Sequence, residues 1–161
     1  TSVTGVQTCA LPIYKRLPKD RAFNIPKDIL INFNSNTYKL NDSYAWSLLK
    51  ILEENLFTSN KKMWDLVYLD GSHRYDVDLA ATACIKELLN VGGYFVLDDV
   101  NWSIGKSSTL NNPDSYKKYT SDQINSEHIK LIVNTILRTD KRFKEIPQSN
   151  SDRAVFMKIN F

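Results

Sequence analysis

A strand, a helix and a second strand follow one another within residues 64–97, and this segment constrains the fold more than any other. The runs WDLVYL at 64–69 and YFVL at 94–97 are short and apolar, as is typical of buried strands. Between them, apolar residues recur at helical spacing, namely Val77, Ala80, Ala81, Cys84, Ile85 and Leu88. Two strands joined by a helix form a βαβ unit, so we expect them to lie parallel in one sheet.

The flanking segments predict further elements of an α/β fold. An apolar run at 29–33 predicts another strand, and residues 41–43 offer caps for a helix with apolar positions Ala45, Leu48, Leu49, Leu52 and Leu56. A third helix is expected over 126–138, with an apolar face of Ile129, Ile132, Val133, Ile136 and Leu137. Two closing strands at 143–146 and 154–159 are expected to be antiparallel, because the turn between them is too short for a crossover helix. Residues 100–120 are expected to form a long polar loop.

Three aspartates follow the two central strands directly. Asp70 comes after the first strand, and Asp98 and Asp99 come after the second. Ligands of parallel α/β sheets bind at this end of the strands, and neighbouring strands lie about 4.8 Å apart. Three converging carboxylates repel one another unless a cation lies among them, and oxygen ligands suit magnesium, calcium or manganese. Asp98 and Asp99 can share an ion only if the backbone turns there. The alternative is that one aspartate caps a helix or loop and another is merely solvated.

Other residues in this segment have less specific patterns. His73 follows the first strand closely and could be a general base, a metal ligand, a substrate donor or a loop histidine bonded to backbone. Asp76 and Asp78 have the D-x-D form of nucleotide-sugar transferases, but they lie at a helix start, where capping explains them better and Asp76 is the expected cap. Gly92 and Gly93 are expected to end the helix.

The string DLVYLDGSHRYDVDLAATACIKELLNVGGYFVLDDVNW, which ends at Trp102, resembles the second half of a class I S-adenosylmethionine-dependent methyltransferase. The resemblance lies in D-G-x-H-x-Y after one strand and G-G-x-x-x-x-D-D around the next. It implies a Rossmann-like sheet and an O-methyltransferase that acts on a small molecule or sugar with help from magnesium or another divalent cation. By this resemblance the metal ligands are Asp70, Asp98 and Asp99. The other implied site residues are His73 and Asp70 for catalysis, Ser35, Asn36 and Asp70 for the cofactor, and Trp102 for the substrate.

One departure from the family concerns glycine. The family places a glycine-rich cofactor loop after its first strand, whereas this chain has only five glycines and no such loop. Residues 1–13, TSVTGVQTCALPI, resemble a translated sequencing adapter. We therefore expect residues 14–161 to be the C-terminal part of one methyltransferase domain that lacks its first strands and its glycine-rich loop. Such a fragment is expected to bind the cofactor poorly and to be inactive.

Composition limits the partners and the setting. A net charge of +3 gives no support to nucleic-acid binding, and no apolar run reaches the roughly 20 residues of a membrane span. If residues 1–13 are foreign, Cys84 is the single native cysteine, which agrees with a cytoplasmic protein. The sequence indicates a small-molecule methyl acceptor and no particular oligomeric state. A nucleotide-sugar transferase and a non-catalytic binding domain remain as alternatives.

Overall fold

The computed structural model describes residues 44–59, 63–149 and 152–160 of the 161-residue chain. Several predictions concern residues outside these ranges. They are the adapter-like stretch at 1–13, the strand at 29–33, the cofactor candidates Ser35 and Asn36, and the helix caps at 41–43.

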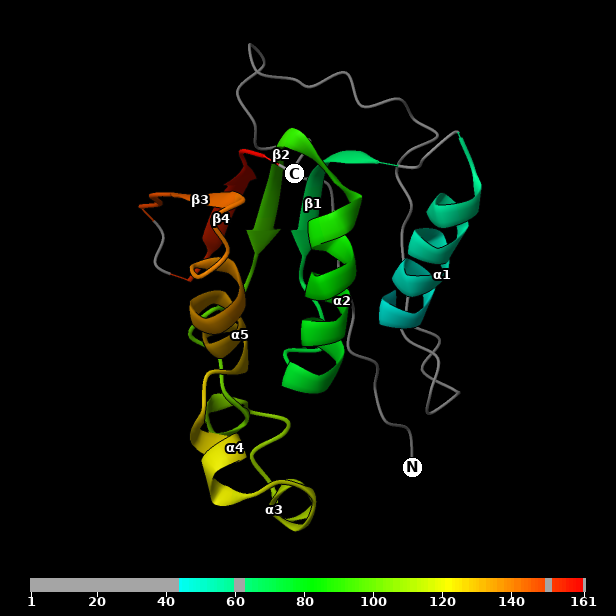
Figure 1. Cartoon of the computed structure of the whole chain (residues 1–161). Helices are drawn as coiled ribbons and strands as arrows, with labels where there is room; N and C mark the ends of the chain where they lie inside the picture. Colours follow the sequence, from blue (N-terminus) through cyan, green and yellow to red (C-terminus); the bar gives the residue numbers. More distant parts are fainter. Residues whose placement is uncertain (1–43, 60–62, 150–151, 161) are drawn as a thin grey trace.

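The described strands form one mixed sheet at the centre of the fold (Figure 1). They are β1 (Trp64–Leu69), β2 (Leu89–Leu97), β3 (Phe143–Ile146) and β4 (Ala154–Lys158), in the spatial order β1-β2-β4-β3. β1 and β2 run parallel, whereas β4 is antiparallel to both β2 and β3. The parallel pair and the antiparallel closing pair predicted from the sequence are both confirmed.

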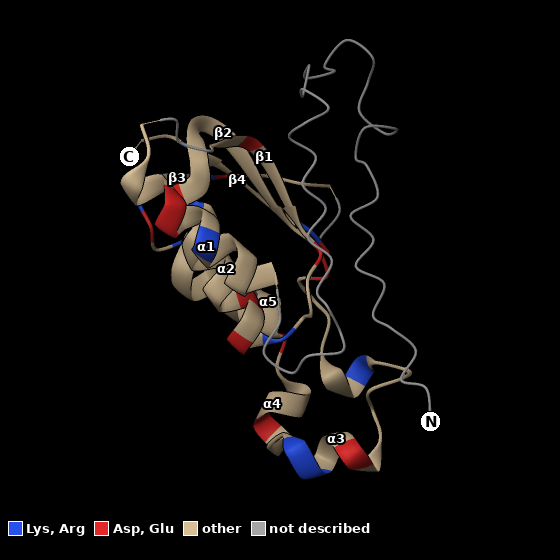
Figure 2. Cartoon of the chain, turned by 90° about the vertical axis from the view of Figure 1, so that its right-hand side faces the viewer, with Lys and Arg blue, Asp and Glu red and all other residues tan. Residues whose placement is uncertain are grey.

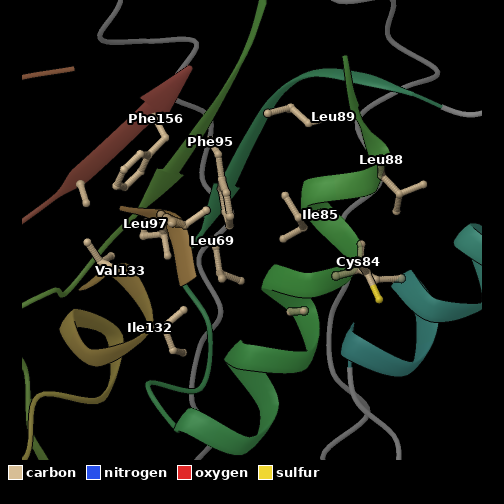
Figure 3. Packing of buried hydrophobic residues seen from close by; sticks show 14 of the residues in the cluster. Leu69, Cys84, Ile85, Leu88, Leu89, Phe95, Leu97, Ile132, Val133 and Phe156 are labelled. Carbon is tan, nitrogen blue, oxygen red and sulfur yellow. The ribbon is translucent and has the colours of Figure 1, made fainter. Parts of the chain in front are cut away.

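Three helices lie on one side of this sheet, with α1 packed against α2 (Figure 1 and Figure 2). They are α1 (Tyr44–Phe57), α2 (Tyr75–Leu88) and α5 (His128–Ile132), which continues into a π-helical turn, η5 (Val133–Leu137). Figure 3 shows side chains of α2 and of the α5 segment meeting those of β1, β2 and β4. Leu88, Phe95, Leu97 and Val133 are fully buried in this interface. The predicted apolar face of the third helix is confirmed, although that helix begins at His128 rather than at residue 126.

The apolar faces of α1 and α2 are narrower than their sequences predict. In α1, the buried residues follow one stripe, Tyr44, Ala45, Leu48, Ile51 and Asn55, which faces α2. Leu49 and Leu56 were expected in the core but are 48% and 73% exposed, because they fall on the neighbouring stripe. Ala80 of α2 is likewise exposed.

Both predicted ends of α2 are wrong. The N-cap residue is Arg74, and Asp76 lies in the first turn with its carboxylate bonded to the Arg74 guanidinium. At the other end, Leu89 passes directly from the helix into β2. Gly92 adopts a φ of +86°, but it does so where the β1–β2 register shifts, not as a helix cap. The left-handed backbone of Gly92 thus allows the irregular pairing of β1 and β2 at this point.

The predicted loop at 100–120 contains short helices. A 3₁₀ turn, η4 (Ile104–Lys106), and α3 (Pro113–Lys118) lie within it, and α4 (Ser121–Asn125) follows. Asn112 caps α3 ahead of a proline in the first turn, and Thr120 forms a capping box with Gln123. Acidic and basic residues are interspersed along α3 and α4 (Figure 2). Among the described residues, no helix has the length and apolar character needed to cross a membrane.

Candidate functional site

Asp70, His73 and Asp99 lie together at the carboxyl ends of β1 and β2. The two strands pair as far as Leu69, and the Asp98 N–H extends the pairing by donating to the Leu69 carbonyl at 3.1 Å. His73 Nε2 lies 3.3 Å from Asp70 Oδ1 and 3.0 Å from Asp99 Oδ2. One ligand atom from each of the three residues lies within 4.8 Å of the others. The structure therefore gathers an imidazole and two carboxylates in one small volume.

A left-handed backbone at two of these residues produces the convergence. His73 has a φ of +55° and Asp99 a φ of +54°, and no other non-glycine residue described has a positive φ. Such conformations cost on the order of 1–3 kcal/mol each and are found where surrounding contacts enforce them. At Asp99, the turn interrupts the alternation of side chains along the strand, so the carboxylate reaches His73.

Asp98 is not part of this group. Its carboxylate accepts hydrogen bonds from Arg153, with Nε at 3.0 Å and Nη2 at 3.2 Å, and from the Tyr68 hydroxyl. The Arg153 guanidinium also lies over the Tyr68 ring, 5.8 Å from its centroid. Asp98 Oδ1 in turn accepts the Asp99 N–H at 3.1 Å. Of the three predicted metal ligands, the structure thus brings together Asp70 and Asp99 and adds His73, while Asp98 is engaged by an arginine.

The three clustered residues perturb one another electrostatically. Burial disfavours the charged form of His73, but the hydrogen bond to Asp70 and the charges of Asp99 and Asp70 outweigh it, so the pKa of His73 is raised. Burial raises the pKa of the Asp99 carboxyl, and the charges of Asp98 and Asp70 add to this while His73 opposes it. The cluster is therefore an environment that favours a positive charge between two carboxylates.

Trp102 borders the cluster. Its ring is half-buried and tilted 42° to the His73 ring, with the two centroids 5.0 Å apart. The tryptophan therefore restricts the His73 side chain on one side and offers an apolar surface beside the polar cluster. This position is compatible with the substrate contact predicted from the sequence.

Asp76 and Asp78 do not form a common site. Asp76 is exposed and pairs with Arg74, whereas Asp78 is fully buried. Oδ2 of Asp78 accepts the Arg74 N–H at 3.0 Å, and Oδ1 accepts the Tyr44 hydroxyl. Because Asp78 is enclosed by protein, the described structure leaves it no surface on which to hold a nucleotide diphosphate.

The donor set fits a divalent cation. Two carboxylate oxygens and one imidazole nitrogen converge, each side chain being between 16% and 37% exposed. Carboxylates suit magnesium and manganese, whereas imidazole suits iron, zinc and other transition metals. The mixed set therefore differs from the all-oxygen set predicted from the sequence and favours a cation that accepts both donor types, such as Mn²⁺.

Sequence reasoning missed two residues, Arg153 and Tyr44, that hydrogen-bond to aspartates next to the cluster. Arg153 lies 55 positions from its partner Asp98, and Tyr44 lies 34 positions from Asp78. Neither pair leaves a local pattern. One signal was available for Asp78. It falls on the same face of α2 as the buried residue Ala81, and a carboxylate on a buried face needs a hydrogen-bond partner.

Comparison with known proteins identified no family model and no curated sequence that matches this chain. Two solved structures match part of this chain. One is the MycE methyltransferase from the mycinamycin biosynthetic pathway in complex with Mg and SAH, at 18% identity and a TM-score of 0.41. The other is the same enzyme with Mg, SAH and mycinamycin VI, at 17% identity and a TM-score of 0.41. In both cases the match covers 71% of this chain and 29% of the other.

Proposed function

We propose that this chain is part of an S-adenosylmethionine-dependent methyltransferase that acts on a hydroxyl group of a small molecule with divalent-cation assistance. The observation that carries the proposal is the convergence of Asp70, His73 and Asp99 at the ends of β1 and β2. These residues lie within the D-G-x-H-x-Y and G-G-x-x-x-x-D-D segments on which the family resemblance rests. The antiparallel β3–β4 pair agrees with the closing strands that the resemblance implies.

Each clustered residue has a distinct part in this proposal. Asp70 and Asp99 supply the negative charge that attracts the cation, and His73 supplies a nitrogen ligand. A bound cation would act as a Lewis acid beside an acceptor hydroxyl, and S-adenosylmethionine would supply the methyl group from its sulfonium. Trp102 covers one side of His73 and provides an apolar contact for the acceptor. Holding the two reactants in line is where much of the rate enhancement would come from.

We assign His73 to the ligand role rather than to the general base. Both of its close contacts, to Asp70 and to Asp99, use the same atom, Nε2. That atom faces the centre of the cluster, where a cation would lie. A nitrogen that donates its lone pair to a cation cannot also accept a proton, so the base must be another group.

Titration of Mn²⁺ into the 161-residue chain by calorimetry tests the cation site. We expect one site per chain, with affinity reduced more than about tenfold in Asp70→Asn and in His73→Gln, because each loses a ligand. Asp114→Asn, on exposed α3, is the matched control and should bind as the parent does. Unchanged binding in both cluster variants would refute the site and leave a non-catalytic binding domain as the better description.

Methyl transfer requires a separate experiment. The full-length protein of which we propose that this chain is part would be incubated with labelled S-adenosylmethionine and hydroxyl acceptors, with and without Mn²⁺. We expect cation-dependent transfer that Asp70→Asn abolishes. Transfer that is insensitive to chelation would contradict the metal-assisted mechanism while keeping the methyltransferase assignment.

A further inference from the structure

A buried polar pair lies behind the loop that carries Asp70 and His73. Tyr44, at the start of α1, is 6% exposed, and Asp78, in the first turns of α2, is completely buried. The Tyr44 hydroxyl donates to Asp78 Oδ1. Burial and the adjacent Asp78 charge raise the pKa of Tyr44, so the hydroxyl keeps its proton and remains a donor. A buried carboxylate is costly unless it is fully hydrogen-bonded, and the remaining bonds of this pair all go to one segment.

That segment is the turn between β1 and α2. The Tyr44 hydroxyl accepts the Ser72 N–H at 2.9 Å, and Asp78 Oδ2 accepts the Arg74 N–H at 3.0 Å. The Ser72 hydroxyl lies 3.4 Å from Asp78 Oδ2. The pair therefore holds the backbone on both sides of His73, the residue with a φ of +55°.

Gly71 fits this arrangement sterically. A Cβ atom at this position would lie 2.5 Å from the Tyr44 hydroxyl oxygen and closer still to Asp78 Oδ1. The turn can thus approach the pair only because residue 71 has no side chain. Two hydrogen bonds and one close approach together define the path of residues 71–74.

We propose that Tyr44 and Asp78 are positioning residues that set His73 Nε2 against Asp70 and Asp99. This inference rests on the proposed function, because it assigns the pair to the same cation site. Outer contacts of metal ligands govern affinity by orienting the ligands. Here the orientation acts through the backbone, since the strained φ of His73 needs enforcement from outside the residue.

The test compares Tyr44→Phe and Asp78→Asn with Tyr116→Phe in the 161-residue chain. Tyr116 is an exposed tyrosine on α3 whose hydroxyl donates to Asn111 Oδ1 at 2.8 Å. Its variant therefore controls for the loss of a tyrosine hydroxyl. We expect Mn²⁺ binding to be about tenfold weaker in the first two variants than in the parent. The control variant should bind Mn²⁺ as tightly as the parent does. Thermal unfolding of each metal-free variant, recorded in parallel, measures any general loss of stability.

A second readout does not need the metal. The chain has two histidines, His73 and His128, and their ring signals can be followed by NMR. His128 is buried and bonded to the Gln123 carbonyl at 2.7 Å. Its Nδ1 accepts the Tyr75 N–H at 3.4 Å, so it reports on α4 and on the start of α2. Tyr44→Phe and Asp78→Asn should shift the His73 signal by more than that of His128, because the backbone on both sides of His73 is bonded to the pair directly.

The outcomes separate the two proposals. If the parent chain binds no Mn²⁺, the cation site of the proposed function fails, but a selective shift of His73 still supports the positioning role. If both variants lose thermal stability while Mn²⁺ affinity and the His73 signal stay at parental values, the pair stabilises the fold only and the inference is overturned.

Discussion

Arg153 binds both carboxylate oxygens of Asp98, with Nε 3.0 Å from Oδ1 and Nη2 3.2 Å from Oδ2. This bidentate pair engages an aspartate that the sequence places among the metal ligands. It leaves Asp99, the next residue, as the carboxylate that faces His73. The distinction between two adjacent aspartates gives the first prediction.

Asp98→Asn should weaken Mn²⁺ binding about tenfold less than Asp99→Asn does. The first change removes a charge that Arg153 already compensates, whereas the second removes a donor from the cluster. Calorimetric titration of both variants measures the difference. Equal losses would mean that Asp98 is a ligand after all, as the sequence alone predicts.

Gly71→Ala should destabilise the chain by about 1–3 kcal/mol, the usual cost of overpacking. The added methyl group meets the Tyr44 hydroxyl and the Asp78 carboxylate, neither of which can move without losing buried hydrogen bonds. Gly92→Ala is the informative comparison, because Gly92 has a positive φ but open space around it. Urea unfolding should show a larger loss for Gly71→Ala, and the reverse order would contradict the crowding described at residue 71.

Mn²⁺ should quench tryptophan fluorescence through Trp102. Its ring centroid lies 5.0 Å from that of His73, and a cation bound by His73 would be close to the indole. We expect Trp102→Phe to remove most of the metal-dependent change. Trp46→Phe, which alters an exposed residue of α1, should leave it intact. A change that persists without Trp102 would place the binding site elsewhere.

Protonation of Asp140 should account for part of the stability that the protein loses at acid pH. Hydrogen bonds from Arg142 and the nearby Lys86 hold the pKa of this carboxyl below its usual range. As the pH falls, Asp140 is therefore protonated first in the unfolded chain, near pH 4. The contribution of the ionised carboxylate to the free energy of unfolding is fully present above that pH and is lost as the pH falls further. Urea midpoints between pH 2 and pH 7 should fall less steeply in Asp140→Asn than in the parent. The exposed variant Asp114→Asn should follow the parent curve.

The core elements could be predicted because their sequence patterns are local. The run from Trp64 to Leu69 and the run from Tyr94 to Leu97 are continuous apolar segments, and both are strands in the structure. The turn between β3 and β4 is too short for anything except antiparallel pairing, and that pairing is observed. A buried strand or helix face requires apolar residues at regular spacing along the chain, so the element can be predicted from a single sequence.

The site could be predicted only in part, because its geometry depends on distant residues. Asp70 and Asp99 follow strands and were placed correctly at their ends, but the choice between Asp98 and Asp99 depends on Arg153 and on a left-handed turn. Asp78 looked like a residue at a helix start that favours the positive end of the dipole, yet it accepts a hydrogen bond from Tyr44 of another helix. Hydrogen-bond partners that come from separate elements have no fixed spacing in the sequence, so they cannot be predicted from it.

The position of β4 between β2 and β3 has a consequence for synthesis. β4 is the last of the four described strands to leave the ribosome. Among these four, β3 pairs with β4 alone, and β4 separates it from β2. Until residue 158 is free, β3 has no described partner strand, and neither has the edge of β2 that pairs with β4. Nascent chains of this protein would therefore carry an open sheet edge until β4 emerges, and an open edge can pair with another nascent chain.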